Sequence, residues 1–161
     1  MSVSDEPIER DLGFDEFTRS VGERVRRALV AFYGVEIGTE AAAEAMSVTW
    51  QRWAEVSAMA NPAGFVFRVG QSKARPHVRW WVRRDSFPST DGQVAASDGS
   101  RLDVLDALRR LKPDERAAVV LVKSHGYSYR EAADILGVSE AAVTNHVHRG
   151  LIRLRTIMEV D

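Results

Sequence analysis

The sequence predicts an all-α protein made of two small helical domains joined by a flexible linker. Apolar residues recur at helical spacing over most of the 161 residues, and no useful stretch alternates apolar and polar residues as a half-buried strand would. Residues 85–100 have no apolar period and are rich in Ser, Gly and Asp, which is typical of a linker. The predicted domains are therefore residues 10–84 and 101–161.

Three helices are predicted before the linker. The first covers residues 14–34 and places aromatic and aliphatic residues on one face. The second runs from Thr39, as its N-cap, to near Ser57. The third begins at Pro62 and contains Pro76, whose missing N–H should kink or split it. The side of the second helix that we expect to be buried contains Met46, Trp50, Trp53 and Val56.

The C-terminal segment begins with a leucine-spaced helix over residues 102–111 and continues with a helix over 114–125. A longer helix is expected at the end of the chain. Its apolar residues recur at helical spacing and are expected to be buried. They are Val143, Val147, Leu151, Leu154 and Met158.

A helix-turn-helix is predicted between these segments. Ser128 and Glu131 form an S-x-x-E capping box at the start of one helix. Gly137 occupies the turn, where a left-handed residue is needed, and Ser139 can cap the second helix. Val138 is expected to fill the angle between the two helices. The combination is specific, although an ordinary helical hairpin is an alternative.

The second helix of this motif should present one face to solvent. With Val143 buried and 100° per residue, the outward arc contains Ala141, Asn145, His148, Arg149 and Ile152, flanked by Thr144 and His146. Small residues permit close approach to a groove, and Asn and Arg are good readers of base edges. The arc is therefore predicted to contact the major groove of DNA.

The charge of the chain is distributed unevenly. The net charge is −1, yet residues 56–84 contain 6 basic residues and no acidic one. Such a block favours a polyanionic partner, although a solvated helix face is the alternative. Trp80 and Trp81 lie among its arginines, where they could stack on unpaired bases or belong to the core.

These motifs resemble a known family, the extracytoplasmic-function (ECF) sigma factors of bacterial RNA polymerase. The stretch "LRRLKPDERAAVVLVKSHGYSYREAADILGVSEAAVTNHVHRGLIRLR" is similar to their region 4. The pieces "TWQRWAEV" and "NPAGFVFRVGQSKAR" resemble region 2. The resemblance covers about residues 14 to 157, with the two regions in the family's order.

The resemblance implies a subunit that binds core RNA polymerase and directs promoter recognition and opening for transcription initiation. It also implies an anti-sigma factor as a further partner. The residues expected to bind promoter DNA are Arg68, Lys73, Arg75, His77, Arg79, Trp80, Arg83, Arg130, Ser139, Ala141, Thr144, Asn145, His148 and Arg149. Those expected to bind the polymerase are Glu40, Glu44, Trp50 and Gln51.

Several positions depart from the family pattern, among them Glu40, where Asp is common, and Pro76, which is unusual in the basic helix. Ala43 stands where Gln is expected on the helix that meets the polymerase. Thr144 and His146 stand where the family often has Lys and Arg. Fewer cations on the recognition helix predict weaker or differently tuned promoter binding, because phosphate contacts dominate affinity for DNA.

Other classes of protein fit the sequence less well. One alternative is a helix-turn-helix regulator that acts without core polymerase, and another is a sigma-like decoy that acts by protein interaction alone. An enzyme is not expected, and neither a cofactor nor a metal site is predicted, because His146 and His148 leave a helix on different faces. The lack of Cys and of any long apolar run predicts a cytoplasmic protein without membrane insertion.

Overall fold

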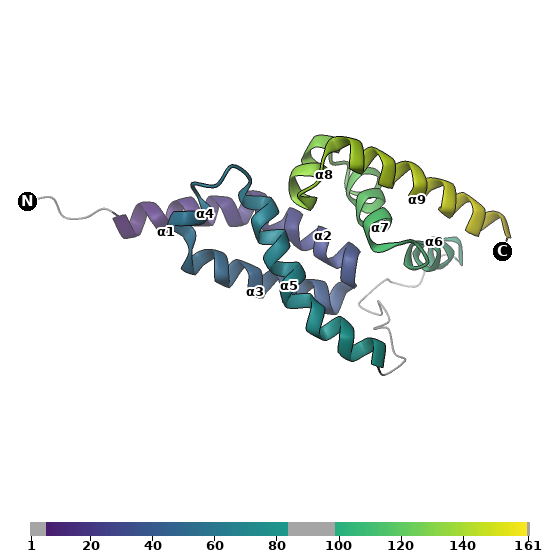
Figure 1. Ribbon diagram of the computed structural model, residues 1–161, viewed down its shortest axis with the longest axis horizontal. Coiled ribbons are helices and arrows are strands. Elements are labelled where there is room, and N and C mark those ends of the chain that lie inside the picture. The colour runs from purple at the N-terminus through teal and green to yellow at the C-terminus, as the bar shows by residue number, and fades with distance from the viewer. Residues whose placement is uncertain (1–5, 84–98, 161) are drawn as a thin grey trace, which may run out of the picture.

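The computed structural model describes residues 6–83 and 99–160, and the side chains of residues 12–77 and 104–160. Every regular element in these ranges is helical, which confirms the predicted all-α class (Figure 1). The N-terminal elements are α1 (Glu6–Phe17), η1 (Thr18–Gly22), α2 (Glu23–Tyr33), α3 (Val35–Gln51), α4 (Trp53–Val56) and α5 (Pro62–Arg83). The C-terminal elements are α6 (Gly99–Arg109), α7 (Pro113–Val119), η2 (Val120–Ser124), α8 (Tyr129–Leu136) and α9 (Glu140–Val160).

The turn between α2 and α3 consists of a single residue. Gly34 has φ +90°, which only glycine adopts easily, and α3 follows directly at Val35. The predicted N-cap at Thr39 is therefore wrong, because Thr39 lies inside α3. The two helices then pack tightly, since a Cβ on Gly38 would lie 2.5 Å from the Cα of Val30.

The buried face of α3 also differs from the prediction. It is formed mainly by small residues and one Ile, and the predicted Trp50 is 38% exposed. Trp53 and Val56 are buried as expected, but they belong to the separate helix α4. The helix axis changes at Arg52 (φ −110°, ψ 20°), which rotates these two residues into the core independently of α3.

Helix α5 is continuous through Pro76, so the predicted splitting is wrong. Its core face contains Val66, Phe67 and Ala74, each at most 2% exposed. Pro76 itself is exposed. The lost backbone hydrogen bond therefore does not end the helix, whose preceding turns are anchored by the core.

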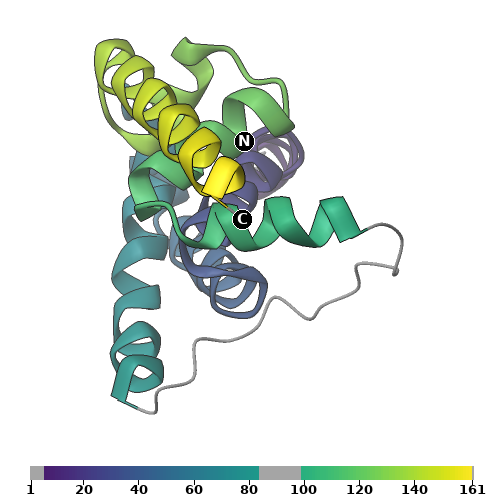
Figure 2. The same cartoon turned by 90° about the vertical axis from the view of Figure 1, so that its right-hand side faces the viewer.

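One hydrophobic core joins the two halves of the chain. Buried residues of α2, α3 and α5 pack in the same cluster as residues of α7, α8 and α9. Figure 2 shows the green and yellow C-terminal helices beside the N-terminal ones. Helix α2 contacts α7 and α8, and α5 contacts α8. The predicted linker, residues 85–100, lies outside the described residues except for its last two, which begin α6.

Four apolar side chains of the C-terminal half are less buried than predicted, among them the half-buried Leu154. Val138 is 41% exposed, so it does not fill the angle between α8 and α9. Leu151 is 39% exposed, although α9 still contacts α7 on either side of it, through Gly150 and Arg153. Met158 is 50% exposed near the end of α9, where the helix extends past α7 (Figure 1).

Candidate nucleic-acid interface

The helix-turn-helix forms as its local signals predict. The Ser128 hydroxyl accepts from the Glu131 amide at 3.0 Å, and the Glu131 carboxylate accepts from the Ser128 amide at 2.8 Å. The hydrogen bond from the Ser128 backbone lowers the pKa of Glu131. Gly137 adopts the left-handed conformation (φ 66°, ψ 33°) and ends α8. Ala132 and Ala133 are buried, which lets α9 approach α8 closely.

The start of α9 fixes which face of the helix is exposed. The Ser139 hydroxyl accepts from the Ala142 amide at 3.1 Å, which confirms the predicted cap. Val143, Val147 and Gly150 are buried against the neighbouring helices. The predicted outward residues are all exposed: Ala141, Thr144, Asn145, His148, Arg149 and Ile152.

The polar side chains of this exposed face differ in their availability. The Thr144 hydroxyl donates to the Glu140 carbonyl oxygen at 2.9 Å, so it is partly engaged by its own helix. The side chains of Asn145, His148 and Arg149 make no hydrogen bond or ion pair with any described residue. Arg130, on α8, is also exposed. His146 is half-buried, so it contributes less to this surface than its neighbours.

Helix α7 holds α9 at a fixed distance. A Cβ on Gly150 would lie 2.7 Å from a methyl carbon of Val119, so glycine is required for this approach. Glu115 is 3% exposed, and its carboxylate forms an ion pair with Arg153 at 3.3 Å without hydrogen-bond geometry. Because a buried carboxylate without a partner is strongly unfavourable, this ion pair helps to orient α9.

The basic block of α5 divides between two faces. Arg68 and Arg75 are exposed and lie two turns apart on one side of the helix. Lys73 and His77, one turn apart, lie on another side toward α3, where Lys73 Nζ is 3.8 Å from a Glu44 carboxylate oxygen. The side chains of the predicted Arg79, Trp80 and Arg83 lie outside the described residues.

The residues predicted to bind polymerase lie on α3 but not on one face. Glu40 and Gln51 are exposed, and Glu44 is half-buried on the same side. Trp50 is turned away from them, and its ring packs 4.9 Å from the ring of Phe14 on α1. Glu40 and Glu44 instead lie beside His77, a proximity that the sequence did not indicate.

Comparisons with known proteins agree with this geometry. The family description "Sigma-70, region 4" matches residues 101–154, which include the helix-turn-helix. The RNA polymerase sigma factor CarQ of Myxococcus xanthus is 33% identical over 102 residues, 58% of this chain and 59% of CarQ. The ECF RNA polymerase sigma factor SigE of Mycolicibacterium smegmatis is 29% identical over 154 residues, 88% of this chain. The chain is therefore similar to sigma factors of the ECF type over most of its length, and residues 101–154 match their region 4.

Solved structures share the fold of this chain over both of its halves. The sigma factor RpoE, in complex with the anti-sigma factor NepR from Bartonella quintana, matches with a TM-score of 0.62 and 21% identity over 92% of this chain and 98% of RpoE. CnrH, in complex with the cytosolic domain of CnrY, matches with a TM-score of 0.58 over 94% of this chain and 90% of CnrH.

Two further facts concern the length of the relatives and the possibility of a membrane-spanning helix. The chain spans about 60% of the length of the first curated relatives, 59% for CarQ and 60% for SigE. Among the described residues, no helix combines the length and apolarity that crossing a membrane requires.

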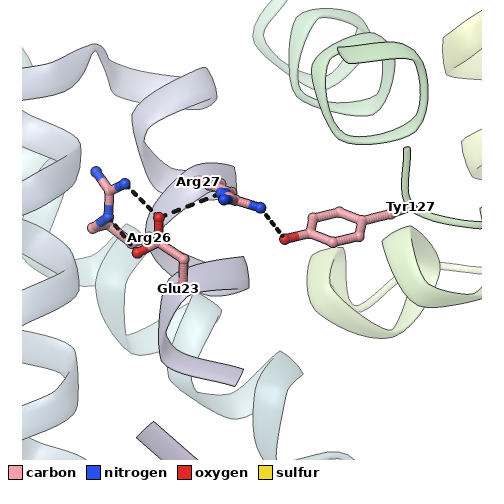
Figure 3. A network of polar contacts seen from close by, with 4 residues as sticks. All are labelled: Glu23, Arg26, Arg27 and Tyr127. Carbon is pink, nitrogen blue, oxygen red and sulfur yellow. Dashed lines mark hydrogen bonds and ion pairs between the residues drawn. The ribbon is translucent and has the colours of Figure 1, made fainter. Parts of the chain in front are cut away.

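The contact between the two halves of the chain, here called the seam, includes Arg27 and Tyr127 (Figure 3). Arg27 Nη1 donates to the Tyr127 hydroxyl at 2.9 Å. Glu23 binds both Arg26 and Arg27, and the hydrogen bond from Arg26 is the main reason that the pKa of Glu23 is lowered. The guanidinium of Arg24 lies 5.3 Å from the centre of the Tyr127 ring.

Arg116, on α7, makes the most extensive polar contact of the seam. Its Nε and Nη2 donate to the carbonyl oxygens of Ala31 and Phe32 at 2.5 and 2.6 Å. These carbonyls belong to the last turn of α2, where a helix presents unpaired acceptors and a partial negative charge. Burial lowers the pKa of Arg116, which nevertheless stays charged because the guanidinium is so basic.

Asn61 forms a further polar contact between the halves. Its side-chain oxygen accepts from the Gly64 amide at 3.0 Å, and its side-chain nitrogen donates to the Asp134 carbonyl oxygen of α8 at 2.8 Å. Sequence reasoning missed Asn61, Arg27, Arg116 and Tyr127, because their partners lie 73 to 100 residues away. No local pattern marks such contacts.

Proposed function

We propose that this chain acts as an ECF-type sigma factor that binds core RNA polymerase and directs promoter recognition and opening. The observation that carries the proposal is the recognition helix α9, whose exposed Asn145, His148 and Arg149 have no partner among the described residues. These side chains are held on a complete helix-turn-helix, within a chain that is similar to ECF sigma factors.

Each surface would have a separate task. Helix α9 would enter the major groove of the minus-thirty-five element, where Asn145 and Arg149 are one turn apart and can reach neighbouring base edges. The exposed Arg68 and Arg75 of α5 would follow the backbone of the minus-ten element as its strands open. The side of α3 that contains Glu40 and Gln51 would meet the polymerase.

The task requires the two halves to separate. The minus-ten and minus-thirty-five elements are about 25 base pairs apart, or about 85 Å of B-form DNA. Helices α5 and α8 are in direct contact, with Asn61 bonded to Asp134. The described arrangement would therefore be a closed form, and engagement of both elements would open the seam.

The proposed partners follow the same reasoning. RpoE and CnrH are both in complex with a further protein, NepR and the cytosolic domain of CnrY. We propose an anti-sigma factor as a partner of this chain, and the cytoplasm as its compartment, where polymerase and DNA are found. The bond-forming chemistry of transcription would belong to the polymerase, so the chain itself would not be an enzyme.

Run-off transcription with purified core polymerase and a promoter library tests the proposal. We expect transcripts only when core polymerase and this chain are both present, from templates that share an upstream and a downstream element. Tight and specific binding of a promoter duplex by the free chain, without stimulation of polymerase, would instead favour a helix-turn-helix regulator that works alone. Activity on every template alike would contradict promoter recognition.

Arg79→Ala separates the two DNA surfaces in the same assay. If Arg79 holds the opened strand, the variant should initiate poorly on duplex templates and recover on a pre-melted one, because the template then supplies the open state. Its preference among upstream sequences should be unchanged. If the pre-melted template instead restored transcription by a variant of the recognition helix α9, the roles of the α5 and α9 surfaces would have to be exchanged.

A further inference from the structure

Three potential metal ligands converge between α3 and α5. Glu40 and Glu44 lie one turn apart on α3, and His77 lies opposite them on α5. One ligand atom of each side chain lies within 4.8 Å of the other two. Glu40 and His77 are exposed, and Glu44 is half-buried, so an ion from solvent can reach all three.

We propose that these three residues form a binding site for a divalent transition-metal ion of the zinc type. Zn²⁺ takes imidazole nitrogen and carboxylate oxygen at about 2.0–2.2 Å, often from three protein ligands with water at the fourth position. Tetrahedral geometry at that bond length separates ligand atoms by about 3.4 Å. The three groups therefore need to close by roughly an ångström, which is within the reach of exposed side chains by rotation.

The local charges favour a cation at this point. Two carboxylates one turn apart on a helix repel each other, and the only described cation paired with them is Lys73. Its Nζ is 3.8 Å from Glu44, at the limit of an ion pair, and its side chain is 42% exposed. Lys73 can therefore swing into solvent and leave the carboxylates to a metal ion, with His77 as the third ligand.

The position of His77 in α5 gives the site a structural role. Ala74 is the last described buried residue of this helix, and Pro76 removes the backbone hydrogen bond that would reach Ser72. The turn that contains His77 is thus weakly anchored. A metal bound to Glu40 and Glu44 would fasten this turn to α3.

The consequence of metal binding rests on the proposed function, whereas metal binding itself does not. The site would join the side of α3 assigned to polymerase to the helix assigned to the minus-ten element. Occupation by metal would neutralise two carboxylates on the polymerase side and restrain the DNA side at once.

Metal titration of the untagged full chain, without polymerase or DNA, tests the site. In isothermal titration calorimetry, one Zn²⁺ ion should bind per chain. The unfolding temperature of the chain should rise with Zn²⁺ concentration, because the ion binds only the folded form appreciably. Co²⁺ should give the visible absorption of a tetrahedral site with nitrogen and oxygen ligands. The chain has no Cys, so thiolate ligands cannot produce the signal.

Variants identify the ligands. His77→Ala and Glu44→Gln should each weaken Zn²⁺ binding by more than about tenfold, since even outer partners of metal ligands have effects of 10–100-fold. Lys73→Ala should strengthen binding, because it removes the competing cation. His148→Ala and Glu36→Gln, which replace exposed residues outside the cluster, should leave binding unchanged.

Two outcomes would overturn the site. One is the absence of saturable Zn²⁺ or Co²⁺ binding by the folded chain. The other is binding that His148→Ala weakens as much as His77→Ala, which would place the ion elsewhere. A chain that binds Zn²⁺ as expected but fails in transcription would refute the proposed function and leave the site standing.

Discussion

The seam and the recognition face of α9 use the same residue types in opposite ways. At the seam, the arginines are partnered: Arg116 donates to two carbonyls of α2, and Arg27 to Tyr127. On α9, Arg149 and Asn145 are exposed and have no described partner. The difference indicates that the seam stabilises the described arrangement of the two halves, whereas the hydrogen-bonding capacity of α9 remains available for a ligand.

Arg116→Ala should have the largest effect on the seam. It removes both donors from the α2 carbonyls and leaves them partly buried without partners, so we expect a loss of about 2–4 kcal/mol in the free energy of unfolding. Urea unfolding followed by circular dichroism measures this loss. Small-angle scattering should show a larger radius of gyration if the halves separate before they unfold.

Arg19→Ala is the matched control for Arg116→Ala. Arg19 also binds a partner, Glu16 at 3.0 Å, but their side chains are 74% and 70% exposed. Exposed pairs contribute little, so the change should be below about 1 kcal/mol. Equal effects of the two substitutions would mean that the seam contact does not stabilise the closed form.

Asn145→Ala tests the other side of the comparison. Because the side chain is exposed and unpartnered, stability should change by less than about 0.5 kcal/mol. Promoter discrimination should fall by about 1–3 kcal/mol at one upstream base pair if Asn145 makes a bidentate contact. A mismatch series over the upstream element, assayed with core polymerase, measures this change.

The decisive observation is whether the loss caused by Asn145→Ala depends on the upstream DNA sequence. Equal weakening on all upstream sequences would show that Asn145 contacts phosphate and not a base. Arg155→Ala is a suitable control, because Arg155 is exposed further along α9, beyond the predicted arc. It should leave the preference at every base pair unchanged.

Sequence reasoning succeeded where the signals are local. The capping box at Ser128, the left-handed Gly137 and the cap at Ser139 each depend on residues within one turn, so a single stretch of sequence specifies them. The exposed face of α9 follows from them and from the buried Val143 and Val147. The functions of the individual exposed residues remain predictions.

Sequence reasoning failed where contacts are distant. Arg116 was not distinguished from any other helical arginine, because its acceptors lie 84 and 85 residues earlier in the chain. The convergence of Glu40, Glu44 and His77 was hidden for the same reason. Trp50 is expected to be buried from its spacing with Trp53 and Val56, but the break at Arg52 places those two residues on a separate helix, and α3 buries smaller residues instead.

Ser128→Ala should have a smaller effect on stability than Arg116→Ala. Ser128 caps α8, the helix that lies between the seam and α9. Loss of the cap should lower stability by about 1 kcal/mol. Ser20→Ala is the control, because that hydroxyl donates to the Glu16 carbonyl oxygen within a continuous helix. It should have little effect, and thermal unfolding of the two variants measures the difference. A larger loss from Ser20→Ala would contradict the assigned role of the cap.

The smallest expected effect is a pH dependence of the seam at His125. Burial, followed by the charge of Arg27, lowers the pKa of His125 below its ordinary 6.5. Arg26 acts in the same direction as Arg27, and Glu23 opposes them. A depressed pKa means that the unfolded chain takes up the proton first as the pH falls. The stability that neutral His125 contributes is therefore present above pH 6.5 and is lost as the pH falls through the folded pKa.

Subtraction of a variant isolates this contribution from all other titrations. The unfolding temperature of the wild type should fall more steeply than that of His125→Gln between about pH 7.5 and pH 5. The difference in slope between the wild type and His125→Gln should shrink in high salt, because screening weakens the repulsion between Arg27 and the imidazolium. Parallel curves would show that His125 titrates alike in the folded and unfolded chain. A wild type that gains stability relative to the variant as the pH falls would reverse the sign, and would mean that Glu23 outweighs the arginines at this end of the seam.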